Sequence, residues 1–164
     1  MARGRPPSWN PFGTMIEGAW TEAVAVSSKE RVTLPAAVRA RLSWFGKATD
    51  EGLLATLDPQ GRSELSAWTT SGSRAVGDVA QRLEAAAPDD RDDLAIAAMD
   101  RYMRLAVEPP ARLALPFGLA VHLDAVEGGV VRIVVSSSRL WLWSERQWQA
   151  RRMDRIDLLT GSAN

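Results

Sequence analysis

The sequence has no cysteine and one histidine, His122, among its 164 residues. Without cysteine it can form no disulfide and no thiolate metal site, which excludes a secreted disulfide scaffold. A single histidine argues against a histidine-based metal centre or catalytic triad within one chain. No stretch approaches the ~18 apolar residues of a membrane span, and no apolar run follows the arginines near Met1, as a secretory signal requires. We therefore expect a cytoplasmic protein with no membrane partner.

The sequence also has no formal net charge at pH 7, because its 20 lysines and arginines balance its 20 aspartates and glutamates. The charges are unevenly placed, however. Residues 1–47 hold seven basic and three acidic side chains, whereas residues 78–108 hold eight acidic and four basic ones. This asymmetry suggests a basic end that faces a polyanion and an acidic middle that faces elsewhere, although ordinary scatter would also produce it.

The sequence shows no glycine-rich phosphate loop, nucleophile elbow or paired catalytic acid and base. The acidic run Asp89–Asp93 is more typical of a helix start than of a metal site. His122 lies between two apolar residues, and we expect it to be half-buried and hydrogen-bonded. We therefore expect no enzymatic activity, no cofactor, no metal and no small-molecule substrate.

One pattern occurs twice in the chain. The segment Lys29–Arg39 is echoed by Pro110–Ala120 at a constant offset of 81 residues. The matched pairs are Arg31 with Arg112, Val32 with Leu113, Leu34 with Leu115, Pro35 with Pro116, and Leu42 with Leu123. A shared offset over these positions indicates two copies of one small unit, which pair to form a platform for binding.

Local patterns predict a mainly β, α+β fold with short helices. The expected strands cover residues 21–26, 32–34, 53–57, 63–67, 113–115, 130–135 and 139–143. Pro35 and Pro116 each open a short helix. Two helices capped near Ser73 and near Asp89 or Asp90 link the units, and a last helix covers 144–159 with Trp148 inward and its arginines mostly outward.

Seven tryptophans are unusual for this length. Trp141 and Trp143 alternate with Leu140 and Leu142, so this strand is apolar on both faces. We expect it to be buried in the core or against a second subunit. The alternative is a stacking platform for single-stranded nucleic acid, which requires basic residues between exposed aromatic rings.

The run Lys29–Pro35, followed by Val38 and Arg39, resembles the signature of the AbrB/MazE swapped-hairpin superfamily. Two copies about 80 residues apart resemble the MraZ family. Ile16–Trp20, Asp90–Tyr102 and Arg139–Trp143 also resemble parts of that family, so the resemblance covers most of residues 15–150. It implies two intertwined, pseudo-repeated AbrB-like swapped-hairpin units that form one domain, a ring-shaped homo-oligomer, and sequence-specific DNA binding.

The family motif is Asp-x-x-x-Arg in each unit. Arg31 and Arg112 match its arginines, while Ser27 and Glu108 occupy the aspartate positions. Glu30 and Ala111 replace the preceding glycines. The residues expected to contact DNA are Lys29, Arg31, Arg39, Arg41 and Arg112, with Arg3 and Arg5 on an N-terminal arm. For Arg112, the alternative is a structural ion pair with Glu108.

These patterns divide the chain into five parts. We expect a flexible basic arm at 1–14, a first unit at 15–70, linking helices at 71–106, a second unit at 107–150, and a helix end and tail at 151–164. The expected function is a nucleoid-associated transcriptional regulator that binds promoter repeats near division and cell-wall genes as a ring. The alternative is a scaffold or antitoxin-like protein that kept the ring and lost the DNA site.

Overall fold

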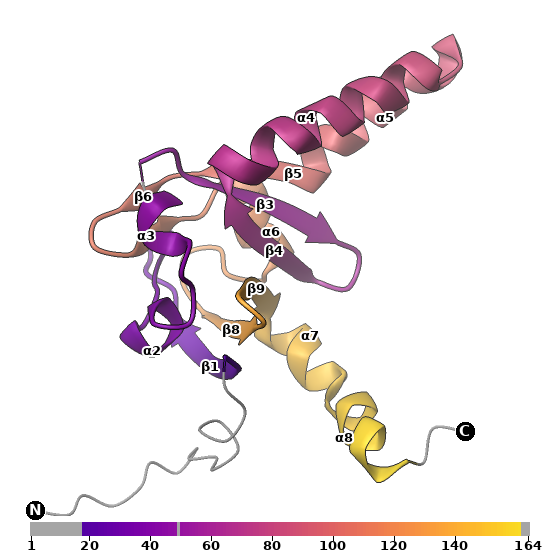
Figure 1. The fold of residues 1–164 in the computed structure, drawn as a ribbon. Coiled ribbons are helices and arrows are strands. Elements are labelled where there is room, and N and C mark those ends of the chain that lie inside the picture. The colour runs from indigo at the N-terminus through magenta and orange to yellow at the C-terminus, as the bar shows by residue number, and fades with distance from the viewer. Residues whose placement is uncertain (1–17, 49, 162–164) are drawn as a thin grey trace, which may run out of the picture.

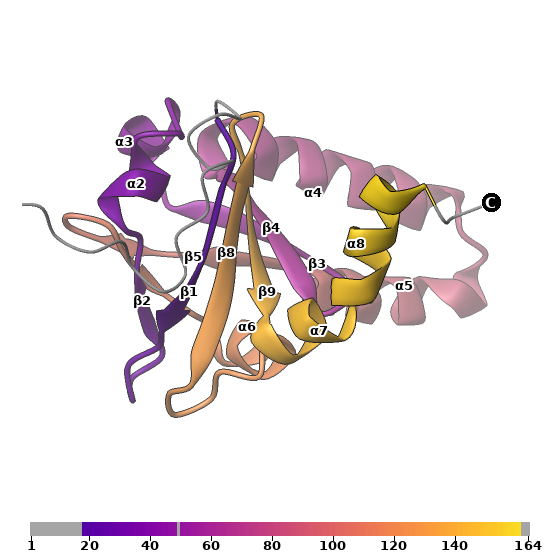
Figure 2. The ribbon, with the colours of Figure 1, turned by 90° about the horizontal axis from the view of Figure 1, so that it is seen from below.

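The computed structural model describes residues 18–48 and 50–161. The arm predicted at 1–14, with Arg3 and Arg5, lies outside these residues. The described chain forms a six-stranded antiparallel sheet in the order β1-β8-β9-β4-β3-β5, and the run from β1 to β3 can be followed in Figure 2. Its strands are β1 (Trp20–Ala25), β3 (Leu53–Asp58), β4 (Arg62–Ala67), β5 (Tyr102–Leu105), β8 (Val130–Ser136) and β9 (Arg139–Ser144).

A second, three-stranded sheet has the order β2-β7-β6. It consists of β2 (Arg31–Thr33), β6 (Val107–Glu108) and β7 (Arg112–Ala114). Short helices follow two of these strands, namely α2 (Ala36–Arg39) after β2 and α6 (Phe117–His122) after β7. The predicted α+β class is therefore confirmed in its broad form, with antiparallel strands and several short helices.

The remaining helices are α3 (Phe45–Ala48), α4 (Trp68–Ala85), α5 (Pro88–Arg101), α7 (Glu145–Ala150) and α8 (Arg152–Thr160). Figure 1 shows α4 and α5 side by side as a helical hairpin that projects from the sheets. It also shows α7 and α8 leaving the body in a different direction. Among the described residues, no helix combines the length and the apolar character that crossing a bilayer requires.

The two echoed segments pair with each other through β2 and β7. Val32 lies opposite Leu113, and both side chains are completely buried. Pro35 and Pro116 each hold the residue position just before the following helix, where their missing N–H groups leave no helical bond unmade. The matched segments therefore pair directly in the small sheet, with β2 at its edge and β7 at its centre.

One apolar cluster joins the two sheets and the short helices. Alternate residues of the large sheet, such as Ile133 and Leu142, point into it, as period-two side-chain geometry requires. Val38 and Leu119 enter it from α2 and α6, together with the small-sheet residues Val32 and Leu113. The predicted inward positions of the short helices are confirmed, since Val38 and Leu42 are both buried.

Four predicted boundaries are wrong. The first linking helix starts at Trp68 rather than near Ser73, because the chain passes directly from β4 into α4. The second linking helix begins at Pro88 with Ala87 as its N-cap residue, so neither Asp89 nor Asp90 caps it. The range 71–106, expected to hold linking helices, ends in a strand instead, because Tyr102 begins β5. The last helix is interrupted at Arg151, whose φ of −98° and ψ of 9° separate α7 from α8.

Polar contacts attach α7 to the large sheet. Arg132 on β8 donates two hydrogen bonds to Glu145, at 2.9 and 2.7 Å. Ser144 caps the helix by accepting a hydrogen bond from the Gln147 amide at 3.3 Å. Trp148 packs edge-on against Trp143 with ring centroids 5.6 Å apart. These contacts hold the start of α7, from which α8 extends.

The Arg132–Glu145 pair predicts a pH dependence of stability. The hydrogen bond from Arg132 lowers the pKa of Glu145, so the charged carboxylate is favoured in the folded state. This stabilisation is present above the ordinary carboxyl pKa of ~4.3 and is lost as the pH falls through the lowered value. Glu145→Gln is expected to reduce the free energy of unfolding by about 1 kcal/mol at pH 7 and by little at pH 3. Urea denaturation at both pH values measures this, with the exposed Glu84→Gln as the control; an equal loss at both pH values would contradict it.

Candidate nucleic-acid interface

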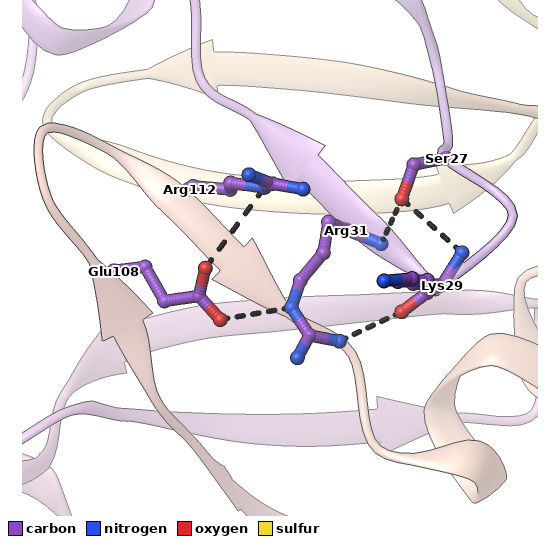
Figure 3. Close-up of polar contacts among 5 residues, drawn as sticks. All are labelled: Ser27, Lys29, Arg31, Glu108 and Arg112. Atoms are coloured by element: carbon purple, nitrogen blue, oxygen red, sulfur yellow. Dashed lines mark hydrogen bonds and ion pairs between the residues drawn. The ribbon is translucent and has the colours of Figure 1, made fainter.

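The turn between β1 and β2 is organised by the Ser27 side chain. Its hydroxyl accepts hydrogen bonds from the backbone amides of Arg31 at 3.1 Å and Lys29 at 3.3 Å. The Ser27 amide in turn donates to the Arg31 carbonyl at 3.0 Å. Serine commonly closes turns in this way. The turn leaves Lys29 exposed beside the start of β2 (Figure 3).

Glu30 has a role in this turn that its position in the sequence did not reveal. Its backbone adopts a left-handed φ of 56°, which is uncommon for a residue other than glycine. Its carboxylate accepts a hydrogen bond from the backbone amide of Glu127 at 2.8 Å. The Glu30 carboxylate therefore connects this turn to the turn before β8, and it forms no ion pair with Arg31 in the described structure.

Arg31 and Arg112 share a single carboxylate. Glu108 is 2.9 Å from Arg31 Nε through one oxygen and 3.9 Å from Arg112 Nε through the other. Arg31 also donates from Nη1 to the Lys29 carbonyl at 2.7 Å. Lys29, Arg31, Arg112 and Glu108 thus gather at one place, shown in Figure 3, and we call them the basic cluster.

The basic cluster carries more positive than negative charge. It combines three cations with one carboxylate, which leaves a formal excess of two positive charges. The side chains remain accessible, with Arg31 33% exposed and Arg112 47% exposed. Ion pairs this exposed contribute at most ~1 kcal/mol each. A phosphate can therefore compete for these guanidinium groups, with which it forms charge-assisted hydrogen bonds.

Of the two expectations for Arg112, the structure bears only on the ion pair with Glu108. Its ion pair with Glu108 exists, but at 3.9 Å it lies near the limit of such a contact. Glu108 lies closer to Arg31, which is 77 residues earlier in the chain, than to Arg112. Arg112 is therefore the more weakly held of the two arginines.

Arg41 is not part of the basic cluster. Its guanidinium lies 4.6 Å from the ring centre of Trp20, and its Nη1 donates to the Ala37 carbonyl at 2.7 Å. Trp20 is the first residue of β1, whereas Lys29 follows the last residue of that strand, Ala25. The strand between them spans roughly 17 Å at the usual rise per residue. Arg41 therefore lies apart from the basic cluster, and its contact with DNA stays a prediction.

Arg39 is held on α2 and is half-buried. Its Nε is buried and has no hydrogen-bond partner within the described residues. No hydrogen bond or ion pair connects Arg39 to the basic cluster in the described part of the chain. The structure therefore brings together Lys29, Arg31 and Arg112, and it leaves Arg39 and Arg41 elsewhere on the first unit.

The outer face of the large sheet carries arginine–aromatic pairs that sequence reasoning missed. Arg139 lies 4.6 Å from the ring centre of Trp141, and Arg62 lies 5.1 Å from that of Trp143. Each arginine also has a carboxylate, Glu64 for Arg139 and Asp58 for Arg62. The period-two spacing of Arg139 and Trp141 was the available sequence signal.

These pairs answer the question of a nucleic-acid stacking platform. Leu140 and Leu142 are buried in the core, as expected, and Trp143 is buried as well. Trp141 is half-buried under the guanidinium of Arg139. Because the rings are covered and the arginines are paired with carboxylates, this face offers little free aromatic surface to a base.

The other candidate groups show ordinary structural contacts. His122 is half-buried, and its Nε2 lies 3.0 Å from the Arg62 carbonyl oxygen. Asp89 and Asp90 lie in the first turn of α5, where their charges complement the helix dipole. Within residues 18–48 and 50–161, no group of histidine, aspartate and glutamate side chains is arranged to hold a metal ion.

A scan against protein-family models finds none that matches the chain, and a search of curated proteins likewise finds no match. Any assignment of function therefore depends on the fold and on the contacts of the described residues. Among the features of the described residues, the accessible basic cluster on the small sheet gives the best support for a binding function.

The Ser27 turn predicts a measurable effect on stability. Ser27→Ala removes the acceptor of the Lys29 and Arg31 amides, which then depend on water. We expect the free energy of unfolding to fall by about 1 kcal/mol. Ser28→Ala, at the exposed neighbouring position, is the matched control and is expected to change it by less than half as much. Chemical denaturation of both variants measures the difference; equal effects would show that the Ser27 hydroxyl does not hold the turn.

Proposed function

We propose that this chain is a DNA-binding transcriptional regulator of the MraZ type. In this proposal each chain contains two AbrB-like swapped-hairpin units, and copies assemble into a closed ring. The ring binds repeated promoter boxes near cell-division and cell-wall genes, and the protein acts at the nucleoid.

The strand order supports the proposal of two interleaved units. The first unit supplies β1, β3 and β4. The second supplies β8 and β9 together with β5, which lies just before the expected start of that unit at residue 107. In the order β1-β8-β9-β4-β3-β5, exchanging the units reproduces the same order from the other edge. The edge strand of each unit pairs with the hairpin of the other, since β1 adjoins β8 and β5 adjoins β3. Such an exchange of edge strands is what a swapped hairpin requires.

The register of β2 and β7 supports the same conclusion. Val32 and Leu113 are equivalent by the offset of 81, and they lie directly opposite each other. Arg31 lies opposite Ala114, and Thr33 lies opposite Arg112, so the pairing is symmetric about that central pair. Two equivalent strands that pair symmetrically place their equivalent side chains close together. Arg31 and Arg112 consequently reach the same carboxylate.

The sharing of Glu108 by Arg31 and Arg112 is the observation that carries the DNA-binding proposal. The shared carboxylate brings the partly exposed guanidinium groups of Arg31 and Arg112 together near Lys29. It is the one negative charge that is paired with them. Serine at position 27 contributes no second carboxylate, so the excess positive charge persists. A single site of this charge binds DNA weakly, but repetition around a ring adds its contacts to repeated DNA boxes.

A scaffold without DNA binding is the second candidate. The 2.9 Å contact between Arg31 and Glu108 favours it, because that guanidinium already has an anionic partner. One measurement distinguishes the two candidate functions, namely how the affinity for DNA changes with salt concentration. A scaffold of the same fold would bind its upstream DNA with no more affinity than an unrelated neutral protein.

The main test is binding to the DNA upstream of the chain's own gene. Fluorescence anisotropy at two salt concentrations is expected to show binding at low salt that weakens as salt rises, because released counterions drive the association. Scrambled DNA of the same length and composition is the control. Failure to bind at low salt, or equal affinity for the scrambled duplex, would overturn the proposed function in favour of the scaffold.

Substitutions in the basic cluster locate the interface. Arg112→Ala is expected to lower the slope of log affinity against log salt by ~0.9 for each protomer in contact with DNA. Glu108→Gln is expected to increase affinity, because it removes the carboxylate that competes with phosphate. Arg74→Ala removes an exposed arginine from α4 and is expected to change neither quantity. If Arg74→Ala and Arg112→Ala weaken binding equally, DNA does not contact the basic cluster.

A further inference from the structure

The helical hairpin carries an open apolar groove. The α4–α5 groove has a volume of about 370 Å³, and Trp68, Val76, Leu83, Met99 and Tyr102 are among the residues that line it. Met99 is 68% exposed, and Val76 is exposed as well. A monomeric protein rarely leaves several large apolar side chains exposed in one concave place. This groove therefore has the character of a docking surface.

One end of the groove is held rigidly. The Trp68 indole packs directly against the backbone of Gly72, so that any side chain at position 72 would collide with the ring. On the strand side, the Arg104 guanidinium lies 4.4 Å from the Trp68 ring centre and donates to the Glu51 carbonyl at 2.6 Å. The packing of Trp68 against Gly72 and Arg104 means that the aromatic wall of the groove is already formed before an occupant binds.

A second unpartnered apolar surface lies on α8. Met153, Ile156 and Leu159 recur at every third residue and are exposed, Met153 by 61%. With 3.6 residues per turn they lie within an arc of about 120°, and we call them the apolar stripe of α8. Leu158 is also exposed but lies about 200° from Ile156, on the other side of the helix.

The groove is long enough to hold α8. The α4 wall of the groove extends from Trp68 to Leu83, or roughly 22 Å of helix. The nine residues of α8 measure roughly 13 Å, so the whole helix fits along that wall. An amphipathic helix that lays an apolar face into an apolar groove is a common mode of recognition.

The two surfaces also carry opposite charge. The start of α5 holds the acidic residues Asp89, Asp90, Asp92 and Asp93 around Arg91. Residues 151–155 at the start of α8 hold three arginines, Arg151, Arg152 and Arg155, and one acid, Asp154. Arg155 Nη1 and Arg151 Nε are buried and have no hydrogen-bond partner among the described residues. Burial, followed by repulsion from Arg132 and Arg152, lowers the pKa of Arg155. The start of α8 therefore has a formal net charge of +2 over residues 151–155, against −3 over residues 89–93 of α5.

We propose that the apolar stripe of α8 in one copy of this chain docks into the α4–α5 groove of the next copy. Figure 1 shows that the two surfaces belong to separate projections of the same chain. Each copy therefore offers one groove and one stripe. A contact between unlike surfaces repeats from copy to copy and generates a ring when its rotation closes. This inference rests on the self-association proposed above and names the surfaces that produce it.

Paired substitutions test the contact. Met99→Glu in the groove and Met153→Glu on the stripe each place a charge in an apolar contact, and each replaces a side chain already exposed in the single chain. Ile96→Glu on α5 and Leu158→Glu on α8 are matched controls, because both residues are exposed outside the proposed contact. We expect the unmodified chain and both controls to be oligomers by light scattering, and both Met variants to be monomers with unchanged circular dichroism.

A mixing experiment distinguishes this contact from general destabilisation. The Met153→Glu copy keeps an intact groove, and the Met99→Glu copy keeps an intact stripe. An equal mixture of the two variants is therefore expected to form a two-chain species, while each alone stays monomeric. Two folded variants that remain monomeric when mixed would contradict the docking of stripe into groove.

Two further outcomes separate this inference from the proposed function. If the unmodified chain is monomeric at micromolar concentration, both the docking and the proposed ring are wrong. If it is oligomeric and both Met variants remain so, the ring assembles through another surface, and only the docking is wrong. A small apolar molecule found in the groove by native mass spectrometry, with assembly unaffected by Met99→Glu, would likewise overturn the docking.

Discussion

The antiparallel pairing of β2 with β7 is the constraint on which the rest of the structure depends. It joins segments 81 residues apart through Val32 and Leu113, neither of which is exposed to solvent. Since side chains alternate along a strand, burying these two residues sends Arg31 and Arg112 to the opposite face. The same antiparallel pairing starts α2 and α6 from opposite ends of the strand pair, and the apolar sides of both helices enter one core. Packing and the placement of the cations therefore follow from a single register.

The stability of the fold and the proposed DNA binding depend on opposite faces of the β2–β7 pair. The buried face supplies the large favourable term, because completely buried leucine and valine side chains each contribute on the order of 2 kcal/mol. The exposed face supplies ion pairs that are individually weak. The arginines are consequently positioned by the core beneath them rather than by Glu108. A ligand can replace the carboxylate at these arginines without disturbing what holds the strands together.

The sequence predicted the features that depend on neighbouring residues. Pro35 and Pro116 each act over a few residues, and the short helices that they predict are present. The partner of Arg31 could not be predicted in this way, because Glu108 reaches it only through the pairing of β2 with β7. The contact of Arg41 with Trp20 also could not be predicted locally, because the two residues lie 21 positions apart and meet only in the folded chain. The break at Arg151 likewise lies within a continuous helical pattern.

The exposed helices give the proposed assembly a physical link to DNA binding. A nine-residue helix such as α8 is marginally stable by itself in water, so contact with another surface is expected to order it. Assembly would then fix several basic clusters relative to one another. With an excess of only two positive charges, one cluster releases few counterions and binds weakly. Clusters held at fixed spacing add their contacts only on DNA whose boxes repeat at a matching spacing, so the geometry of assembly would itself select the DNA.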